Sequence, residues 1–144
     1  RFDQYLRGDE DALTADEKRG YALFKKYGCA TCHAGKILGG QSFEKMGLYE
    51  DYFADRGNVH TPDYGRFNFT QREEDRFKLK APTLRNIAIT FPYFHDGTTS
   101  DLKEAVNTMV KYQTPHARIS DRDADLIVTF LKALTGEYAG KSLQ

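Results

Sequence analysis

The sequence predicts a mainly α-helical domain with one long irregular segment. Three segments repeat apolar residues at the spacing of an amphipathic helix. No two alternating segments flank a tight turn, so no β-hairpin is expected. The length of 144 residues suits one domain, 1–144, in which residues 1–13 form a linker or lead-in segment.

The first predicted helix begins after Thr14, whose side chain can cap it while Glu17 completes a capping box. Gly28 supplies a stop directly after the last apolar position. The apolar positions of this helix share one face: Gly20, Leu23, Phe24 and Tyr27.

Two further helices are predicted in the last third of the chain. Ser100 can cap the second helix, and Ser120 can cap a third that ends at Gly136. A shorter helix is expected after Pro82, because proline suits the first helical position. The apolar stripes are Leu102, Val106, Met109 and Val110 in the second helix, and Ala124, Ile127, Val128, Leu131 and Leu134 in the third.

Residues 34–81 show neither the 3.6-residue period of a helix nor the two-residue period of a strand, yet they are rich in aromatic residues. Disordered segments are poor in aromatic residues, so an ordered, winding segment with short helical turns is expected. These aromatic residues are Phe43, Tyr49, Tyr52, Phe53, Tyr64, Phe67, Phe69 and Phe77.

Charge and hydropathy exclude two classes of partner. The 21 basic and 21 acidic residues cancel and are interspersed, so neither nucleic acid nor an anionic membrane is an expected partner. The longest apolar run, residues 126–134, is interrupted by Lys132 and is far shorter than the roughly 20 residues that cross a bilayer.

The two cysteines and the following histidine form a C-x-x-C-H motif, which is typical of covalent haem c attachment. Thiols three residues apart can reach the two vinyl groups of one porphyrin, so Cys29 and Cys32 would form thioethers. His33 would then be an axial ligand of the iron. A thioredoxin-like redox pair usually needs a βαβ context, which is missing. A zinc site needs further close ligands, and no other cysteine exists.

The second axial position decides whether the iron is open to small oxidants or closed for electron transfer. The residues that could fill the second axial position are Met46, Met109, His60, His95 and His116. Met109 lies on an apolar helical stripe, where a methionine can equally be a core residue that fills a gap. The residues alone leave this choice open.

Four segments resemble the C-terminal half of the bacterial dihaem cytochrome c peroxidases, a family that includes MauG: CATCHAGKILGGQSF, KAPTLRNIAITFPYFHDG, VNTMVKYQ and IVTFLKALTGE. The resemblance implies a class I cytochrome c-like helical domain wrapped around one covalently bound haem. It implies His33 and Met109 as the axial ligands of a high-potential haem. It also implies a calcium ion held in part by the backbone carbonyls of Thr90 and Pro92.

The implied role is electron transfer: the domain accepts electrons from a small cytochrome c or copper protein and passes them to a peroxidatic haem domain that reduces hydrogen peroxide to water. Such a domain is not expected to be catalytic alone. The family further implies a periplasmic location and allows a homodimer. A second C-x-x-C-H and any tryptophan are absent. The chain is therefore expected to be part of a longer protein; the alternative is a free-standing monohaem electron shuttle.

Overall fold

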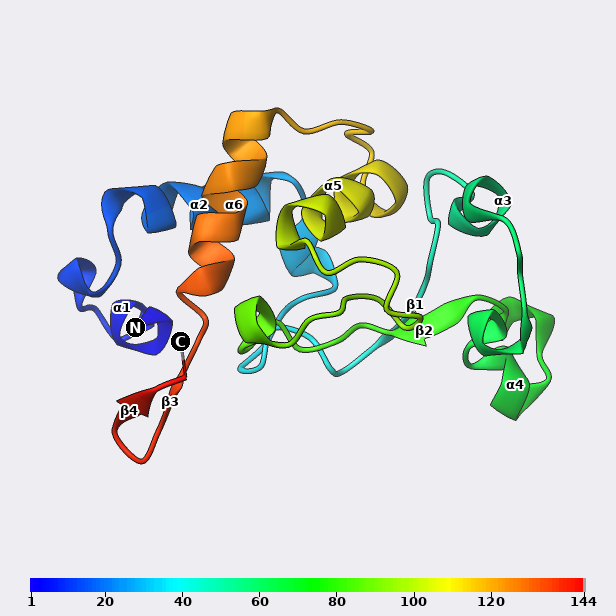
Figure 1. The fold of residues 1–144 in the computed structure, drawn as a ribbon, viewed down its shortest axis with the longest axis horizontal. Coiled ribbons are helices and arrows are strands. Elements are labelled where there is room, and N and C mark those ends of the chain that lie inside the picture. The colour runs from blue at the N-terminus through cyan, green and yellow to red at the C-terminus, as the bar shows by residue number, and fades with distance from the viewer. Residues whose placement is uncertain (144) are drawn as a thin grey trace.

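The computed structural model describes residues 1–143, and it confirms the mainly α class (Figure 1). No helix among these residues has both the length and the apolar character needed to cross a bilayer. The α-helices are α1 (Phe2–Leu6), α2 (Ala15–Lys26), α3 (Tyr52–Arg56), α4 (Phe67–Thr70), α5 (Leu102–Gln113) and α6 (Asp121–Lys132). Short 3-10 turns are η1 (Glu10–Ala12), η2 (Cys29–Thr31), η3 (Thr61–Tyr64), η4 (Glu73–Asp75) and η5 (Ile87–Ile89).

The starts of α2 and α6 are the predicted ones. The Thr14 hydroxyl accepts a hydrogen bond from the Glu17 backbone N–H at 3.2 Å, and the Glu17 carboxylate accepts one from the Thr14 N–H at 2.8 Å. The Ser120 hydroxyl accepts from the Asp123 N–H at 3.1 Å. Gly28 follows α2 with φ +82°, a left-handed conformation that favours glycine. α6 ends at Lys132, before the predicted Gly136.

The cap of α5 differs from the prediction. Asp101, not Ser100, occupies this position, and its carboxylate accepts from the backbone N–H groups of Lys103 and Glu104 at 2.7 and 3.1 Å. One carboxylate therefore satisfies two of the amides that a helix start leaves free. Its negative charge also lies at the positive end of the helix dipole.

Two other predictions are wrong. Pro82 does not open a helix; the first helical turn after it is η5, which begins at Ile87. Residues 1–143 also contain two antiparallel strand pairs, and β3 (Glu137–Tyr138) with β4 (Lys141–Ser142) is a hairpin, which was not expected. Ala139 and Gly140 turn it with φ +51° and +75°. Strands of two residues are too short to show alternation in the sequence. The other pair joins β1 (Phe43–Lys45) to β2 (Lys78–Lys80).

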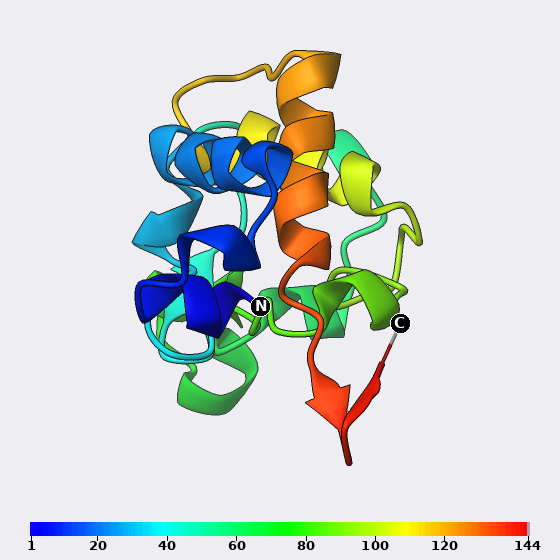
Figure 2. The same cartoon turned by 90° about the vertical axis from the view of Figure 1, so that its left-hand side faces the viewer.

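The larger core cluster lies where α2 crosses α6, with α5 beside them (Figures 1 and 2). The crossing is close at Gly20: a Cβ atom there would lie 2.0 Å from the backbone oxygen of Leu126. Phe2 and Leu13 of the lead-in segment are also buried in this core. Its other buried residues are Phe24, Tyr27, Leu38, Leu84, Val106, Val110, Ala124, Ile127, Phe130, Leu131, Ala133 and Leu134.

A second, smaller core cluster is built mainly from the long irregular segment. Figure 1 shows α3 and α4 on the right, away from the α2–α6 crossing, with α5 between. The strand pair β1–β2 lies beside them and joins the two ends of this segment. The buried members of the second cluster are Met46, Tyr52, Phe53 and Tyr112, and Phe77, Leu79, Phe94 and Met109 pack against them.

We expect Gly20→Ala to destabilise the protein, although Ala is the better helix former by about 1 kcal/mol. The added methyl must displace the Leu126 carbonyl of α6, and overpacking of this kind costs about 1–3 kcal/mol. Chemical denaturation measures the free energy of unfolding. Gly136→Ala is the control, because its Cβ meets only the Asn86 side-chain oxygen at 3.5 Å. A Gly20→Ala protein as stable as the parent would contradict the close crossing.

Candidate haem site

The C-x-x-C-H motif begins on η2 and runs past it to His33, shortly after the end of α2. Gly28 redirects the chain, and the His33 N–H donates to the carbonyl of Cys29 at 3.0 Å. This single turn places Cys29 and Cys32 about one helical repeat apart, so both thiols lie on the same side of the turn and can reach two vinyl groups at the edge of one porphyrin. Both cysteines are free and partly buried. The local structure therefore has the form that two thioether bonds to one porphyrin require.

The two thiols do not have the character of a redox dithiol. Burial raises the pKa of the Cys29 thiol to about 11, and burial also raises the pKa of Cys32. Both groups are therefore protonated at neutral pH. Reactive C-x-x-C pairs have at least one thiol with a lowered pKa. The environment of this motif thus disfavours the thioredoxin-like alternative.

His33 has the tautomer that an iron ligand needs. Its Nδ1 lies 3.1 Å from the backbone oxygen of Pro82. A carbonyl oxygen can only accept, so Nδ1 carries the proton and Nε2 keeps a free lone pair. The pKa of His33 is lowered, mainly because the ring is buried, and the lowered pKa keeps the imidazole neutral. Two thiols and a neutral, oriented imidazole on one turn fit a haem c group.

Gly39 allows the Pro82 carbonyl to reach His33. It has φ +129°, and a Cβ atom there would lie 2.0 Å from the Pro82 oxygen and 3.3 Å from Nδ1 of His33. Hydrogen bonds from the Leu84 N–H to the Leu38 carbonyl and from the Gly40 N–H to the Ala81 carbonyl hold the two segments together. The sequence did not reveal this contact, because Pro82 is 49 positions after His33; an unexplained glycine pair at 39 and 40 was its only trace.

The three histidines considered for the other axial position all have different partners. Nε2 of His95 lies 2.6 Å from the Asp63 carboxylate, and Nδ1 of His60 lies 2.9 Å from the Asn58 backbone oxygen. His116 is exposed and its ring lies against Tyr27, with ring centroids 4.9 Å apart. The contact of His60, like that of His33, leaves Nε2 free, so only the carboxylate contact of His95 and the exposure of His116 favour another residue in the second axial position.

Both methionines belong to the second core cluster. Met46 is buried at 7% exposure, whereas Met109 is partly buried and packs against the cluster from α5. The Met109 side chain is therefore in an apolar environment but is not enclosed by protein atoms. Its assignment as the ligand stays a prediction.

The predicted calcium carbonyls are accessible. Thr90 and Pro92 are exposed, and neither backbone oxygen accepts a hydrogen bond from residues 1–143. Calcium takes six to eight oxygen ligands, so two free carbonyls can supply only part of a site.

Comparison with known proteins identifies the family to which the chain is similar. The Cytochrome c family model matches residues 17–135. The chain is 50% identical over 137 residues to cytochrome c peroxidase Ccp of Escherichia coli (strain K12), which covers 95% of this chain and 29% of that protein. It is 44% identical over 137 residues to cytochrome c551 peroxidase of Nitrosomonas europaea, which covers 95% of this chain and 39% of that protein. A MauG-like protein associated with microbial copper homeostasis superposes with a TM-score of 0.78 and 29% identity, over 94% of this chain and 48% of that chain.

The helical fold and the oriented C-x-x-C-H turn define a domain that attaches haem covalently. The chain belongs to the cytochrome c family. The resemblance to bacterial cytochrome c peroxidases and MauG-like proteins is confirmed. The chain spans 29% and 39% of the length of the two peroxidases it was compared with.

We expect Gly39→Ala to lower the free energy of unfolding by about 2 kcal/mol more than Gly57→Ala does. Both glycines have positive φ, but a Cβ at Gly57 meets nothing within 4 Å, whereas at Gly39 it meets the Pro82 carbonyl. Since alanine is disfavoured by the backbone at both positions, the extra loss at Gly39 reports mainly the close approach. Denaturation of both haem-loaded variants measures it, and equal effects would argue against the His33–Pro82 geometry.

Proposed function

We propose that the chain is the electron-accepting half of a dihaem cytochrome c peroxidase. The observation that carries the proposal is the 50% identity to a cytochrome c peroxidase of which the chain spans only 29%. The remaining length of such a protein is sufficient for a second haem domain, where hydrogen peroxide would be reduced to water. One peroxide requires two electrons, so a domain that holds one electron beside the reaction site is chemically useful.

The axial ligands in this proposal are His33 and Met109. Haem c, when bound, supplies one-electron chemistry, and a thioether ligand favours its reduced state. Cys29 and Cys32 fix the group covalently, and the Pro82 carbonyl orients His33 toward it. Met109 closes the opposite side from α5, so no position is left for a small oxidant.

The proposed partners follow from this role. One is the peroxidatic haem domain, and the other is a small donor protein, either a cytochrome c or a copper protein. The proposed location is the periplasm, because bacterial haem c attachment takes place outside the cytoplasm.

The same proposal includes a calcium ion at the carbonyls of Thr90 and Pro92. Carbonyl oxygens suit calcium; both residues are exposed, and neither carbonyl accepts a hydrogen bond from residues 1–143. The missing ligands would come from water and from the second haem domain.

We expect Met109→Ala to remove the long-wavelength absorption band that methionine gives to oxidised haem. The open position should then raise the affinity of the reduced protein for carbon monoxide by about tenfold or more, since each 1.4 kcal/mol or so of lost ligation is about tenfold. Met46→Ala is the matched control, because it removes the other methionine of the same cluster. Loss of the band in Met46→Ala instead would move the ligand to that residue.

We expect the haem-loaded chain alone to reduce hydrogen peroxide at no more than about one hundredth of the rate of a two-haem peroxidase, because a haem with two protein axial ligands has no vacant position. A steady-state assay with a reduced donor protein measures the rate. Met109→Ala should be faster than the parent chain. Turnover by the parent chain at the rate of a two-haem enzyme would contradict the proposed division between the domains.

A further inference from the structure

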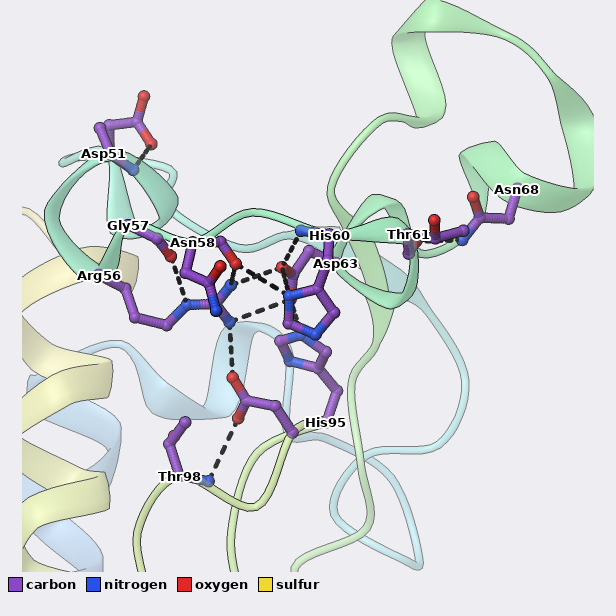
Figure 3. Close-up of polar contacts among 12 residues, drawn as sticks. Asp51, Arg56, Gly57, Asn58, His60, Thr61, Asp63, Asn68, His95 and Thr98 are labelled. Atoms are coloured by element: carbon purple, nitrogen blue, oxygen red, sulfur yellow. Dashed lines mark hydrogen bonds and ion pairs between the residues drawn. The ribbon is translucent and has the colours of Figure 1, made fainter.

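An ionic network centred on the buried carboxylate of Asp63 lies beside the second core cluster, and the proposed function assigns it no role. Figure 3 shows Arg56 at the end of α3, with its guanidinium directed toward Asp63. The same guanidinium forms a second ion pair with the carboxylate of Asp96. Two guanidinium nitrogens reach the two oxygens of Asp63 at 3.0 and 2.5 Å, and one of them also reaches Asp96 at 2.6 Å. His95 and the His60 backbone N–H complete the shell of Asp63, at 2.6 and 2.9 Å.

Asp63 is the centre of this network. Its side chain is fully buried, while those of Arg56, His95 and Asp96 are 18%, 17% and 12% exposed. The hydrogen bonds from Arg56 are the main reason that the pKa of the Asp63 carboxyl lies far below its usual range. The carboxylate therefore stays charged at neutral pH, and its partners stay attached to it.

The network is not arranged to bind a metal ion. Asp63, His95 and Asp96 present ligand atoms within 4.8 Å of one another, a spacing that could suit a cation. The Arg56 guanidinium already supplies a positive charge to both carboxylates. A cation would therefore have to displace a bidentate ion pair whose carboxylate is fully buried.

The network joins two segments far apart in the sequence. Arg56 belongs to α3, whereas His95 and Asp96 lie in the loop that the Tyr93–Thr99 bridge closes. The rings beside the network cross the same junction: Phe53 packs edge-on against His95 with centroids 5.9 Å apart, and Tyr52 lies 6.3 Å from Phe94. The ion pairs therefore fix how α3 meets the segment that contains Phe94.

α3 in turn packs against the part of α5 that holds Met109. Tyr52 and Phe53 are buried in the cluster against which Met109 packs, and Tyr52 contacts Tyr112 of α5 with centroids 5.2 Å apart. The Tyr112 hydroxyl also donates to Asp55 of α3 at 2.9 Å. A shift of α3 therefore changes the wall that surrounds the Met109 side chain.

We propose that Arg56 and Asp63 are positioning residues for the sulfur of Met109, an inference that rests on the proposed axial role of this methionine. Neither residue touches the sulfur. They hold α3 and the Phe94 segment in one arrangement, and this arrangement sets where the Met109 side chain lies. Ligands that are not held in place by a supporting shell lose affinity for their metal.

The test uses the haem-loaded protein in its oxidised state, titrated with imidazole. Imidazole competes with the methionine, and loss of the long-wavelength methionine band reports its displacement. We expect Asp63→Asn to bind imidazole about tenfold more tightly than the parent, because a weakly held methionine is displaced more easily. Arg56→Lys, which keeps the charge but cannot pair with both carboxylates in the same way, should shift in the same direction.

Glu17→Gln is the matched control. Glu17 is a buried carboxylate in a bidentate pair with Arg1, but it lies in α2, away from the second cluster. Its imidazole affinity should stay within about twofold of the parent if the effect is specific to the Met109 wall. A parent protein without the methionine band overturns the proposed axial ligand and this inference with it. A second outcome overturns only the positioning role. In it the parent shows the methionine band, and the folded Asp63→Asn and Arg56→Lys proteins bind imidazole as tightly as the parent does.

Discussion

The hydrogen bond from His33 Nδ1 to the carbonyl of Pro82 connects the two parts of the chain that build the haem site. It determines the tautomer of the imidazole, because the carbonyl can only accept, and so it determines which nitrogen is free for iron. It also requires close backbone packing, which Gly39 permits. One local turn is enough to place the two cysteines, but it is not enough to orient the His33 imidazole. That orientation depends on a segment that reaches its place only when the whole chain is folded.

The two core clusters hold different parts of the haem site in place. The larger cluster at the α2–α6 crossing buries most of the aliphatic and aromatic side chains, so it supplies most of the hydrophobic stability and holds the C-x-x-C-H turn at the end of α2. The second cluster is smaller and is rich in aromatic residues from the irregular segment. It contributes less to stability but provides the wall on the Met109 side. Substitutions in the second cluster can therefore alter the site while the α2–α6 scaffold stays folded.

Local interactions account for what the sequence predicts well. Thr14 and Ser120 cap helices through contacts three residues away, so their pattern is visible in the chain. The C-x-x-C-H motif is local in the same sense. The sequence does not decide the cap of α5, because Ser100 and Asp101 are adjacent and both suitable; in the structure the Asp101 carboxylate reaches two amides. The segment after Pro82 is not helical: the Leu84 N–H donates to the Leu38 carbonyl and the Asn86 N–H to the Leu134 carbonyl, both far away in the sequence. Contacts of this range leave no periodic signal.

The Arg56–Asp63 pair illustrates why a small cluster needs polar contacts. A buried ion pair is a weak source of stability, because the desolvation of both charges offsets most of their attraction. Its effect is instead geometric: two guanidinium nitrogens and two carboxylate oxygens meet in one orientation only. Aromatic rings such as Phe53 and Phe77, stacked at 4.7 Å, can slide with little loss of contact. A cluster made of such rings is specified by the directional bonds at its edge, and the position of the Met109 wall depends on them.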